Sequence, residues 1–338
     1  MTIGRWTEVG LQGFAAIRRG LARWGLGVAA VGFCLASTWA ADNPAELRIG
    51  FQKSASVFVL QKSQRSLEKR LVPLGVAVKW VEFPAGPQLL EGLNVGSIDV
   101  GYVGEAPPIF AQAAGANFVY VVFDPAAPGA EAIIVPKTSA IRTVADLKGK
   151  KVALNKGSNV HYLLVRVLQN SGLAYADVQP VFLPPADARA AFERGAVDAW
   201  AIWDPFLAAA QTQLGARIVA DGQGAVNNYA YYLAERQYAE KYPQVLDVLF
   251  EDLREQGALI NQDPAKAAAR VAPLQGLDPE VVERALRRNP SGVAPVTAAI
   301  AAQQQKIADV FAELKLIPKP IRVADTLPGA ATRAAPGK

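Results

Sequence analysis

The chain alternates short apolar runs with amphipathic stretches from residue 47 onward. Runs with the length and composition of buried or half-buried strands lie at residues 47–51, 76–83, 99–103, 118–123, 132–135, 152–154, 178–183, 197–203, 217–220 and 229–234. Segments with helical spacing of apolar residues separate most of them, for example at 57–71, 88–94 and 107–114. Residues 238 to about 314 are purely helical in pattern. Strands that alternate with helices in this way are typical of an α/β fold.

Residues 151–168 combine a strand, a tight turn and a helix start in one short segment. The apolar run 152–154 suits a buried parallel strand, Gly157 permits a sharp turn, and Ser158 or Asn159 can cap the helix that follows. The first turn of a helix has free N–H groups and carries the positive end of the helix dipole, so it favours a phosphate, sulfonate or carboxylate. The segment is therefore a candidate anion site. The alternative is a plain connection between a strand and a helix.

The first 40 residues have the layout of a secretory signal peptide. Four arginines precede the apolar run 24–38, and small residues surround a cleavage point near Ala40. The run is short for a transmembrane helix, so we expect cleavage; the alternative is a retained N-terminal anchor. The pair Arg18-Arg19 hints at twin-arginine export, which leaves the export route open.

Removal of this segment changes what the composition implies. The first 40 residues contain four of the 35 basic and one of the 30 acidic residues, which leaves 31 basic and 29 acidic residues, or a net charge of +2. A nearly neutral chain gives no reason to expect nucleic-acid binding. Cys34 is the only cysteine and His161 the only histidine, so the mature chain is not expected to have disulfides, thiol catalysis or a zinc or copper site.

About 300 mature residues exceed the usual size of one domain, which predicts two lobes. The chain is expected to cross between lobes at 125–129 and again at 227–228. We therefore expect a discontinuous first lobe (41–130 and 228–322), a second lobe (131–227), and a mobile tail (323–338) rich in Pro, Gly and Ala. Ligands in such folds bind in the crevice at the carboxyl ends of strands.

Several segments, in order, resemble the sulfonate, nitrate and taurine binding family. The carriers of the resemblance are IGFQK (49–53), GSIDVGYVGEAPP (96–108), VADLKGKKVA (144–153) continuing through His161, LPPADARAAF (183–192) and WAIWDP (200–205). The resemblance is to the aliphatic sulfonate-binding proteins of ABC importers, and it implies a two-lobed type II periplasmic binding protein. Its implied partners are a small-molecule sulfonate and an inner-membrane ABC permease; we expect a periplasmic monomer without a cofactor. Glu105 departs from the pattern, because many relatives have an aspartate there.

Four candidate ligand-binding groups belong to the first predicted lobe. Gln52 and Lys53 follow the first strand, where an amide and an ammonium can reach an anion; the alternative for Lys53 is a solvated loop lysine. Gly104 and Ala106 allow close approach to the backbone at another helix start. Between them, Glu105 can bind an amino group or water, or else complement the helix dipole at the surface.

In the second predicted lobe, Gly157, Ser158 and Asn159 are the strongest candidates, through backbone N–H groups and the Ser158 hydroxyl. His161 contacts the ligand or packs structurally, and the helix start disfavours its protonated form.

The tripeptide at 203–205 adds two further candidates. Trp203 can wall a pocket against an alkyl chain, and Asp204 either faces the ligand or caps the next helix. A carboxylate near the anion suits an amino-bearing sulfonate better than nitrate or sulfate. Within the resemblance, the alternative ligands are taurine, nitrate and pyrimidine precursors of thiamine.

The competing class is an exported hydrolase. Such an enzyme needs a nucleophile with its base, a metal cluster or a cofactor loop. The sequence has no GxSxG, Walker or dinucleotide-binding motif. We therefore expect a binding protein without catalytic residues.

Overall fold

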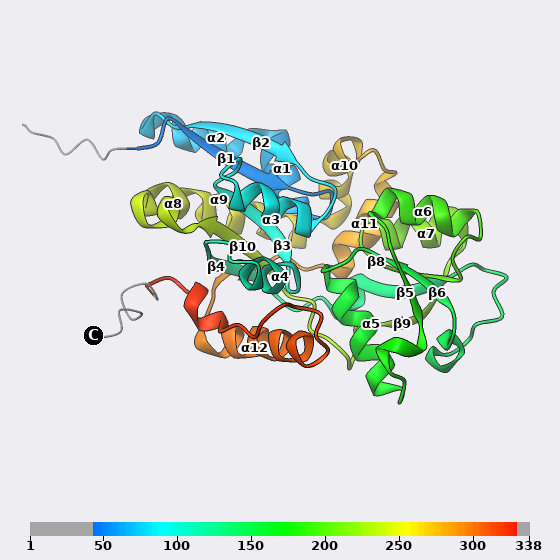
Figure 1. Cartoon of the computed structure of the whole chain (residues 1–338). Helices are drawn as coiled ribbons and strands as arrows, with labels where there is room; N and C mark the ends of the chain where they lie inside the picture. Colours follow the sequence, from blue (N-terminus) through cyan, green and yellow to red (C-terminus); the bar gives the residue numbers. More distant parts are fainter. Residues whose placement is uncertain (1–42, 330–338) are drawn as a thin grey trace, which may run out of the picture. The chain divides into compact units, whose positions relative to one another are not determined.

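The computed structural model describes residues 43–329 (Figure 1). The predicted signal peptide and residues 330–338 of the predicted tail lie outside this part of the chain. The strands are β1 (Glu46–Phe51), β2 (Ala77–Glu82), β3 (Val100–Gly104), β4 (Phe118–Asp124), β5 (Glu131–Val135), β6 (Lys151–Leu154), β7 (Gln179–Phe182), β8 (Ala199–Trp203), β9 (Arg217–Asp221), β10 (Ala230–Glu235) and β11 (Ala294–Pro295).

Helices follow most of these strands, as an α/β fold requires. The α-helices are α1 (Ser56–Gln64), α2 (Ser66–Leu71), α3 (Gly86–Asn94), α4 (Pro107–Ala113), α5 (Asn159–Asn170), α6 (Pro185–Glu193), α7 (Phe206–Leu214), α8 (Arg236–Lys241), α9 (Pro243–Gln262), α10 (Pro264–Gln275), α11 (Pro279–Arg288) and α12 (Ala298–Glu313). The 3₁₀ helices are η1 (Val72–Leu74), η2 (Pro128–Ala130), η3 (Val144–Leu147), η4 (Tyr175–Asp177) and η5 (Val323–Thr326).

The strands of the described residues form two separate mixed sheets. The first has the order β11-β4-β10-β3-β1-β2, with β1 parallel to β2 and β3, and β10 antiparallel to β3 and β4. The second has the order β7-β6-β8-β5-β9, with β6 parallel to β7 and β8. The α/β fold predicted from the alternating pattern is therefore confirmed, and so is the parallel strand at 152–154.

The first sheet is assembled from both ends of the described chain. Its strands come from residues 46–124 and from 230–295, whereas every strand of the second sheet lies between 131 and 221. In Figure 1 the second sheet is therefore green throughout, while the first joins blue and cyan strands to the yellow-green β10. The predicted crossing segments 125–129 and 227–228 lie between strands of different sheets, and Ala127 N–H donates to the Asn227 carbonyl at 3.0 Å.

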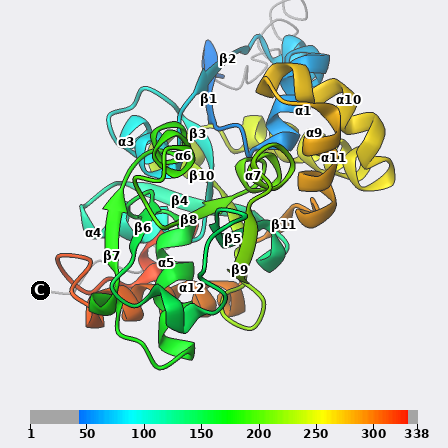
Figure 2. The same cartoon turned by 90° about the vertical axis from the view of Figure 1, so that its right-hand side faces the viewer.

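Helices bury both faces of each sheet. On the first sheet, one core packs α1, α9 and α10 against Leu47, Ile49 and Tyr232, and a second core packs α3, α4 and α12. In Figure 2, α1, α9, α10 and α11 lie together beside this sheet. On the second sheet, α5 covers one face and α6 and α7 cover the other. Burial on both faces explains why these strands are near-continuous apolar runs.

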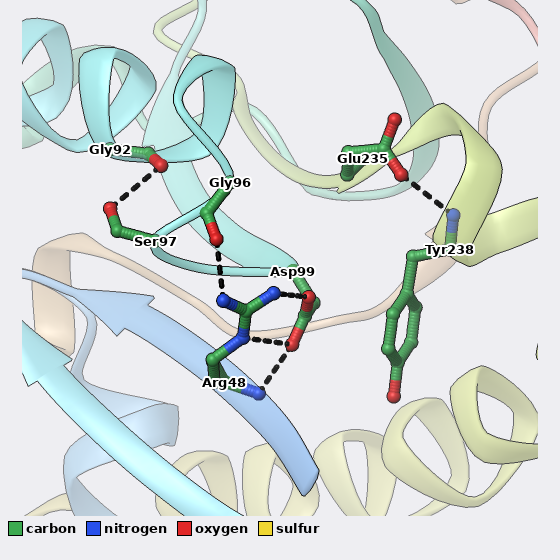
Figure 3. Close-up of polar contacts among 7 residues, drawn as sticks. All are labelled: Arg48, Gly92, Gly96, Ser97, Asp99, Glu235 and Tyr238. Atoms are coloured by element: carbon green, nitrogen blue, oxygen red, sulfur yellow. Dashed lines mark hydrogen bonds and ion pairs between the residues drawn. The ribbon is translucent and has the colours of Figure 1, made fainter. Parts of the chain in front are cut away.

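An ion pair links β1 to the residue that precedes β3 in the first sheet. Arg48 of β1 contacts Asp99 at 2.5 Å, and both the Arg48 backbone N–H and its Nε donate to the same carboxylate (Figure 3). Arg48 also donates to the Gly96 carbonyl, which ties β1 to the turn after α3. Because this network joins the amino-terminal parts of β1 and β3, it stabilises their parallel pairing and lies away from their carboxyl ends.

The structure differs from the predicted elements in two places. The single helix predicted at 57–71 is broken at Arg65, whose φ is 51°. The break lets Gln61 and Ser66 both donate to Asp252 of α9, a carboxylate that is fully buried and needs partners. The purely helical pattern after 238 is interrupted by β11, a short strand with proline that pairs at the edge of the first sheet.

The predicted tail also begins later than expected. Val323 is buried against Phe311 and its neighbours, and its N–H donates to Gln305 at 2.8 Å. Leu327 packs against the same core. The predicted tail is therefore tied to the fold at both Val323 and Leu327.

Candidate functional site

A cavity lies at the carboxyl ends of parallel strands from both sheets. It encloses about 510 Å³, including solvent at its mouth. Its walls come from the ends of β1, β3, β6 and β8 and from the helix starts that follow them. The lining residues are Gln52, Ser54, Gly86, Tyr102, Gly104, Pro107, Ala130, Ser158, Asn159, Trp203, Asp204, Asn228, Ala230 and Asn289.

Six residues singled out from the sequence line this cavity, from four separate segments of the chain. They are Gln52, Gly104, Ser158, Asn159, Trp203 and Asp204. Parallel strands bring their carboxyl ends to one edge of a sheet, which is why residues so far apart in sequence meet here. Gln52 is held by a hydrogen bond from its Nε2 to the Tyr102 carbonyl at 3.2 Å.

The remaining five lie outside the lining. Lys53 turns away, and its Nζ donates to the Gln275 carbonyl at the end of α10 at 2.6 Å. It therefore joins two parts of the first sheet's helical cover and does not supply positive charge to the cavity, contrary to our expectation. Ala106 contributes its backbone N–H to the Asn159 Oδ1 at 3.2 Å, so it supports the cavity wall from behind.

Gly157 and His161 form a structural pair behind the wall. Gly157 adopts a φ of 75°, as the predicted sharp turn requires, and its N–H donates to Nδ1 of His161 at 3.2 Å. Because Nδ1 accepts this bond, the ring proton resides on Nε2, which donates to the Tyr175 hydroxyl at 2.9 Å. Burial and, to a smaller extent, the charge of Lys156 together lower the pKa of His161 to about 4, so the ring is neutral near pH 7.

Glu105 faces a second groove, which is lined by residues of α5, α12 and the segment before β10. The carboxylate is buried, and its Oε2 accepts the Tyr229 N–H at 2.9 Å, while Oε1 has no partner among the described residues. Burial raises the pKa of Glu105 to about 7. Glu131 lies buried nearby, and its pKa is raised well above the usual range by burial and by the charge of Glu105. The alternative of a surface Glu105 is therefore wrong.

Eight of the lining residues were not predicted from the sequence. Gly86 had a usable signal, because the Pro84-Ala85-Gly86-Pro87 sequence between β2 and α3 repeats the strand, small residue and proline pattern seen before α4. Asn228 belongs to a crossing segment that we predicted, without a role for its side chain. Asn289 follows α11 and carries no local signal. Ser54, Tyr102, Pro107, Ala130 and Ala230 adjoin residues or elements that we had identified.

Helix starts converge on the cavity and set its electrostatics. Gly86 opens α3, Pro107 opens α4, and Ser158 occupies the N-cap position of α5. The first turn of each helix has N–H groups without an acceptor in the helix, and the aligned peptide dipoles add positive potential. No lysine, arginine or histidine lies among the lining residues. An anion in this cavity would therefore be held by neutral donors.

Asp204 is the one carboxyl group among the lining residues. Its Oδ1 accepts the Ala208 N–H in the first turn of α7 at 2.9 Å, although the N-cap position that we considered for Asp204 is occupied by Pro205. Burial raises the pKa of Asp204 to about 6, although Arg288 of α11, 3.4 Å from Oδ2, opposes this shift. Trp203 is half-buried beside it and packs edge-to-face on Phe206.

Metal-binding clusters and membrane-spanning helices are both absent from residues 43–329. No group of three or more His, Cys, Asp and Glu side chains in this range is placed to hold a metal ion. No helix in this range is both long enough and apolar enough to span a lipid bilayer.

Comparison with known proteins identifies relatives along most of the chain. A profile of the NMT1-like family matches residues 40–274. A relative in Escherichia coli (strain K12), described as an aliphatic sulfonates-binding protein, is 48% identical over 300 residues, which cover 88% of this chain and 93% of the relative.

Solved structures agree with this relationship. The alkanesulfonate-binding protein SsuA from Xanthomonas axonopodis pv. citri, bound to MOPS, superimposes with a TM-score of 0.82 at 48% identity, covering 85% of this chain and 99% of the other. The periplasmic aliphatic sulphonate binding protein SsuA from Escherichia coli superimposes with a TM-score of 0.77 at 48% identity, covering 84% and 98%.

Proposed function

The chain belongs to the NMT1-like family, and from this premise we propose that it is the extracytoplasmic substrate-binding component of an ABC importer for aliphatic sulfonates. The relatives that share 48% of its residues are sulfonate-binding proteins, which supports the ligand class. The observation on this chain that carries the proposal is the cavity of helix starts without a cationic side chain.

The sulfonate group would lie against the starts of α3, α4 and α5. Backbone N–H groups donate to the sulfonate oxygens, and the helix dipoles offset the charge of the anion. The Ser158 hydroxyl already donates to the Asn155 carbonyl at 2.7 Å, so Ser158 takes part through its backbone. Neutral donors suit a singly charged anion that must also be released to a permease, because no permanent ion pair has to be broken. Gln52 and Asn289 provide further polar contacts from the first sheet's side.

The organic part of the ligand would lie against Trp203 and the small apolar residues of the wall. Trp203 is half-buried, so part of its ring remains free to cover an alkyl chain. Asp204 accepts hydrogen bonds and repels a second negative charge. This side chain favours an amino-bearing sulfonate such as taurine over nitrate or sulfate, and makes taurine the second candidate ligand.

We infer the transport cycle from the two-sheet architecture. Lobe one (41–130 and 228–322) and lobe two (131–227) would close on the ligand by movement about the two crossing segments. The ligand stabilises the closed state because it touches both halves and so binds that state better. We also propose a periplasmic monomer that delivers its ligand to an inner-membrane permease, with the signal peptide cleaved near Ala40.

A thermal-shift panel on the purified exported protein tests the ligand class. The compounds are ethanesulfonate, butanesulfonate, taurine and a sulfonated buffer, against nitrate, sulfate and a pyrimidine. A ligand at a hundred times its Kd stabilises the fold by about 2.7 kcal/mol, which gives a clear midpoint shift. We expect shifts with the sulfonates, and their order gives the preferred tail. A shift only with nitrate, or only with a pyrimidine, would reject the sulfonate assignment.

A turnover assay separates this function from an exported hydrolase. We propose that no bond of the ligand is broken, because the cavity lining contains no nucleophile with an adjacent base. The purified protein is incubated with each alkanesulfonate, and sulfite and alcohol products are measured. Product in molar excess over protein would contradict a binding-only role.

A further inference from the structure

Asn159 makes both of its side-chain hydrogen bonds across the gap between the two sheets. It is the first residue of α5, which follows the second sheet's β6. Its Oδ1 accepts the N–H of Ala106 at the start of α4, and its Nδ2 donates to Oδ1 of Asn228 at 2.6 Å. The residue therefore joins a helix of one sheet to a helix start and a crossing segment of the other.

Asn228 extends this connection to the first crossing segment. Its Nδ2 donates to the Ala127 carbonyl at 2.8 Å, and its φ of 52° turns the side chain between the two crossings. The chain of bonds runs from Ala106 through Asn159 and Asn228 to Ala127. Each amide uses its oxygen as an acceptor and its nitrogen as a donor, which is the only orientation that satisfies every bond.

The absence of a side chain at Gly104 leaves room for the Asn159 amide. A Cβ placed on Gly104 would overlap with Oδ1, Nδ2 and Cγ of Asn159, whereas the backbone of Gly104 does not require glycine for its φ. The missing side chain is therefore explained by the close approach of Asn159 across the gap. Gly104, Asn159 and Asn228 all line the ligand cavity, so the connection forms part of its wall.

We propose that Asn159 and Asn228 form a latch, seated on Gly104, that stabilises the closed arrangement of the two sheets and so raises affinity for every ligand by a common factor. The latch forms between protein groups only, so its contribution does not depend on the ligand's tail. The apparent Kd of a binding protein scales inversely with the fraction of closed molecules. This inference rests on the proposed function only where affinity for a sulfonate is measured.

Three variants break the latch in different ways. Asn159→Ala removes both bonds, Asn228→Gly removes the Asn228 side chain without straining a positive φ, and Gly104→Ala displaces the amide. A net hydrogen bond corresponds to a few-fold change in an equilibrium constant, so each variant should weaken binding about fivefold. The matched control is Asn170→Ala, which removes an exposed asparagine from the other end of α5 and outside the cavity lining, and affinity should stay unchanged.

Calorimetric Kd values for ethanesulfonate, butanesulfonate and taurine decide whether the effect is a latch. We expect the same factor for all three ligands, and the double variant Gly104→Ala with Asn159→Ala should bind like Asn159→Ala alone, because both changes break one contact. A factor that differs between ligands would assign these residues to direct recognition instead. Additive effects in the double variant would overturn the link between Gly104 and Asn159.

Amide hydrogen exchange tests the latch without any ligand. Ala106 precedes Pro107 and Pro108, which have no N–H. Exchange measured at the Ala106 amide is therefore not mixed with exchange at the two residues that follow it. Exchange at Ala106 should be faster in Asn159→Ala and Asn228→Gly than in the wild type, while amides of β1 are unchanged. Equal exchange would reject the latch. If the wild type binds no sulfonate, the proposed function fails, and this measurement still decides the latch.

Discussion

Glu105 shows how burial changes the chemistry of a single side chain. It was considered as a ligand contact or a surface residue, yet it lies buried behind the cavity, with Oε2 bonded to the Tyr229 N–H. Its carbonyl also accepts from Gln304 of α12. Burial raises the pKa of Glu105 to about 7, so its charge changes near neutral pH. The sequence could not reveal this, because which face of a helix start is covered depends on α12, about 200 residues away.

We predict that Glu105→Gln removes part of the pH dependence of stability. The pKa of this carboxyl is about 7 in the folded protein and near 4.5 when unfolded, so its protonated form favours folding. That stability is fully present below pH 4.5 and is lost as pH rises through about 7. Unfolding free energies from urea titration should therefore show the wild type losing about 2–3 kcal/mol, relative to the variant, between pH 4.5 and 8.

The control is Glu240→Gln, which alters an exposed carboxyl and should follow the wild type at every pH. The buried Asp124 and Asp204 change stability in the same direction, with pKa values of about 6, but both are shared by the wild type and the variant. A difference between wild type and Glu105→Gln that stays constant with pH would contradict a neutral, buried Glu105.

At the scale of elements, the segment from β6 to α5 was predicted almost completely. The strand, the turn at Gly157 and the helix are present at the expected positions. Capping differs, because Ser158 donates its hydroxyl to the Asn155 carbonyl and makes no side-chain cap. The His161 ring bonds the Gly157 N–H instead. Ser158 and Asn159, at the start of α5, both line the cavity.

We predict that Ser158→Asp weakens sulfonate binding at least tenfold. Ser158 is buried in the cavity wall, so the added carboxylate would face the bound anion at short range, in surroundings of low dielectric constant. Asp is also a good N-cap residue, so the unfolding midpoint should change much less than the affinity. Isothermal titration calorimetry and thermal unfolding measure the two effects.

Ser171→Asp is the matched control, because it puts the same charge at the exposed carboxyl end of α5. It should lower stability slightly, through the helix dipole, and leave affinity unchanged. Equal affinity of Ser158→Asp and the wild type would mean that the anion is held elsewhere in the cavity.

At the scale of the whole molecule, contacts between the halves surround the ligand site. Arg288 of α11 reaches Asp204 and Gln211, which belong to the second sheet's segment. Asp204 lines the cavity together with Asn159, so a second contact between the halves adjoins the ligand site. Asp204 is nearly buried, so its charge depends on Arg288 as a partner.

We predict that Arg288→Gln weakens sulfonate binding more at high pH than at low pH. Without the guanidinium, the pKa of Asp204 rises above its present value of about 6. At pH 5.5 the Asp204 carboxyl is then protonated, and burying it in the closed cleft costs little free energy. At pH 8 it is charged and has no partner in the closed cleft, so closure on the ligand is less favourable. The ratio of variant Kd to wild-type Kd should therefore increase several-fold from pH 5.5 to pH 8.

Arg287→Gln controls for the loss of a positive charge, because Arg287 pairs with Glu283 on the surface of the same helix. Its affinity should equal that of the wild type at both pH values. If the Kd ratio for Arg288→Gln does not change with pH, the charge of Asp204 is not the cause of the weaker binding.

Sequence alone determined the features that depend on local interactions. All ten predicted strands are present, as are the helix starts at 107 and 159 and the turn at Gly157, because apolar periodicity, proline and glycine act within a few residues. The rule that ligands bind at the carboxyl ends of strands then led to six of the lining residues.

Only the tertiary structure decided which side chains face the cavity and which support it. Lys53, Glu105 and His161 follow the same strand ends as the lining residues, but each is drawn to a partner outside the cavity: Gln275, Tyr229 and Tyr175. Asn159 bonds to Asn228, 69 positions further along the chain. Such pairings require buried polar groups to find partners, and the available partner is set by packing between distant segments, which local sequence does not encode.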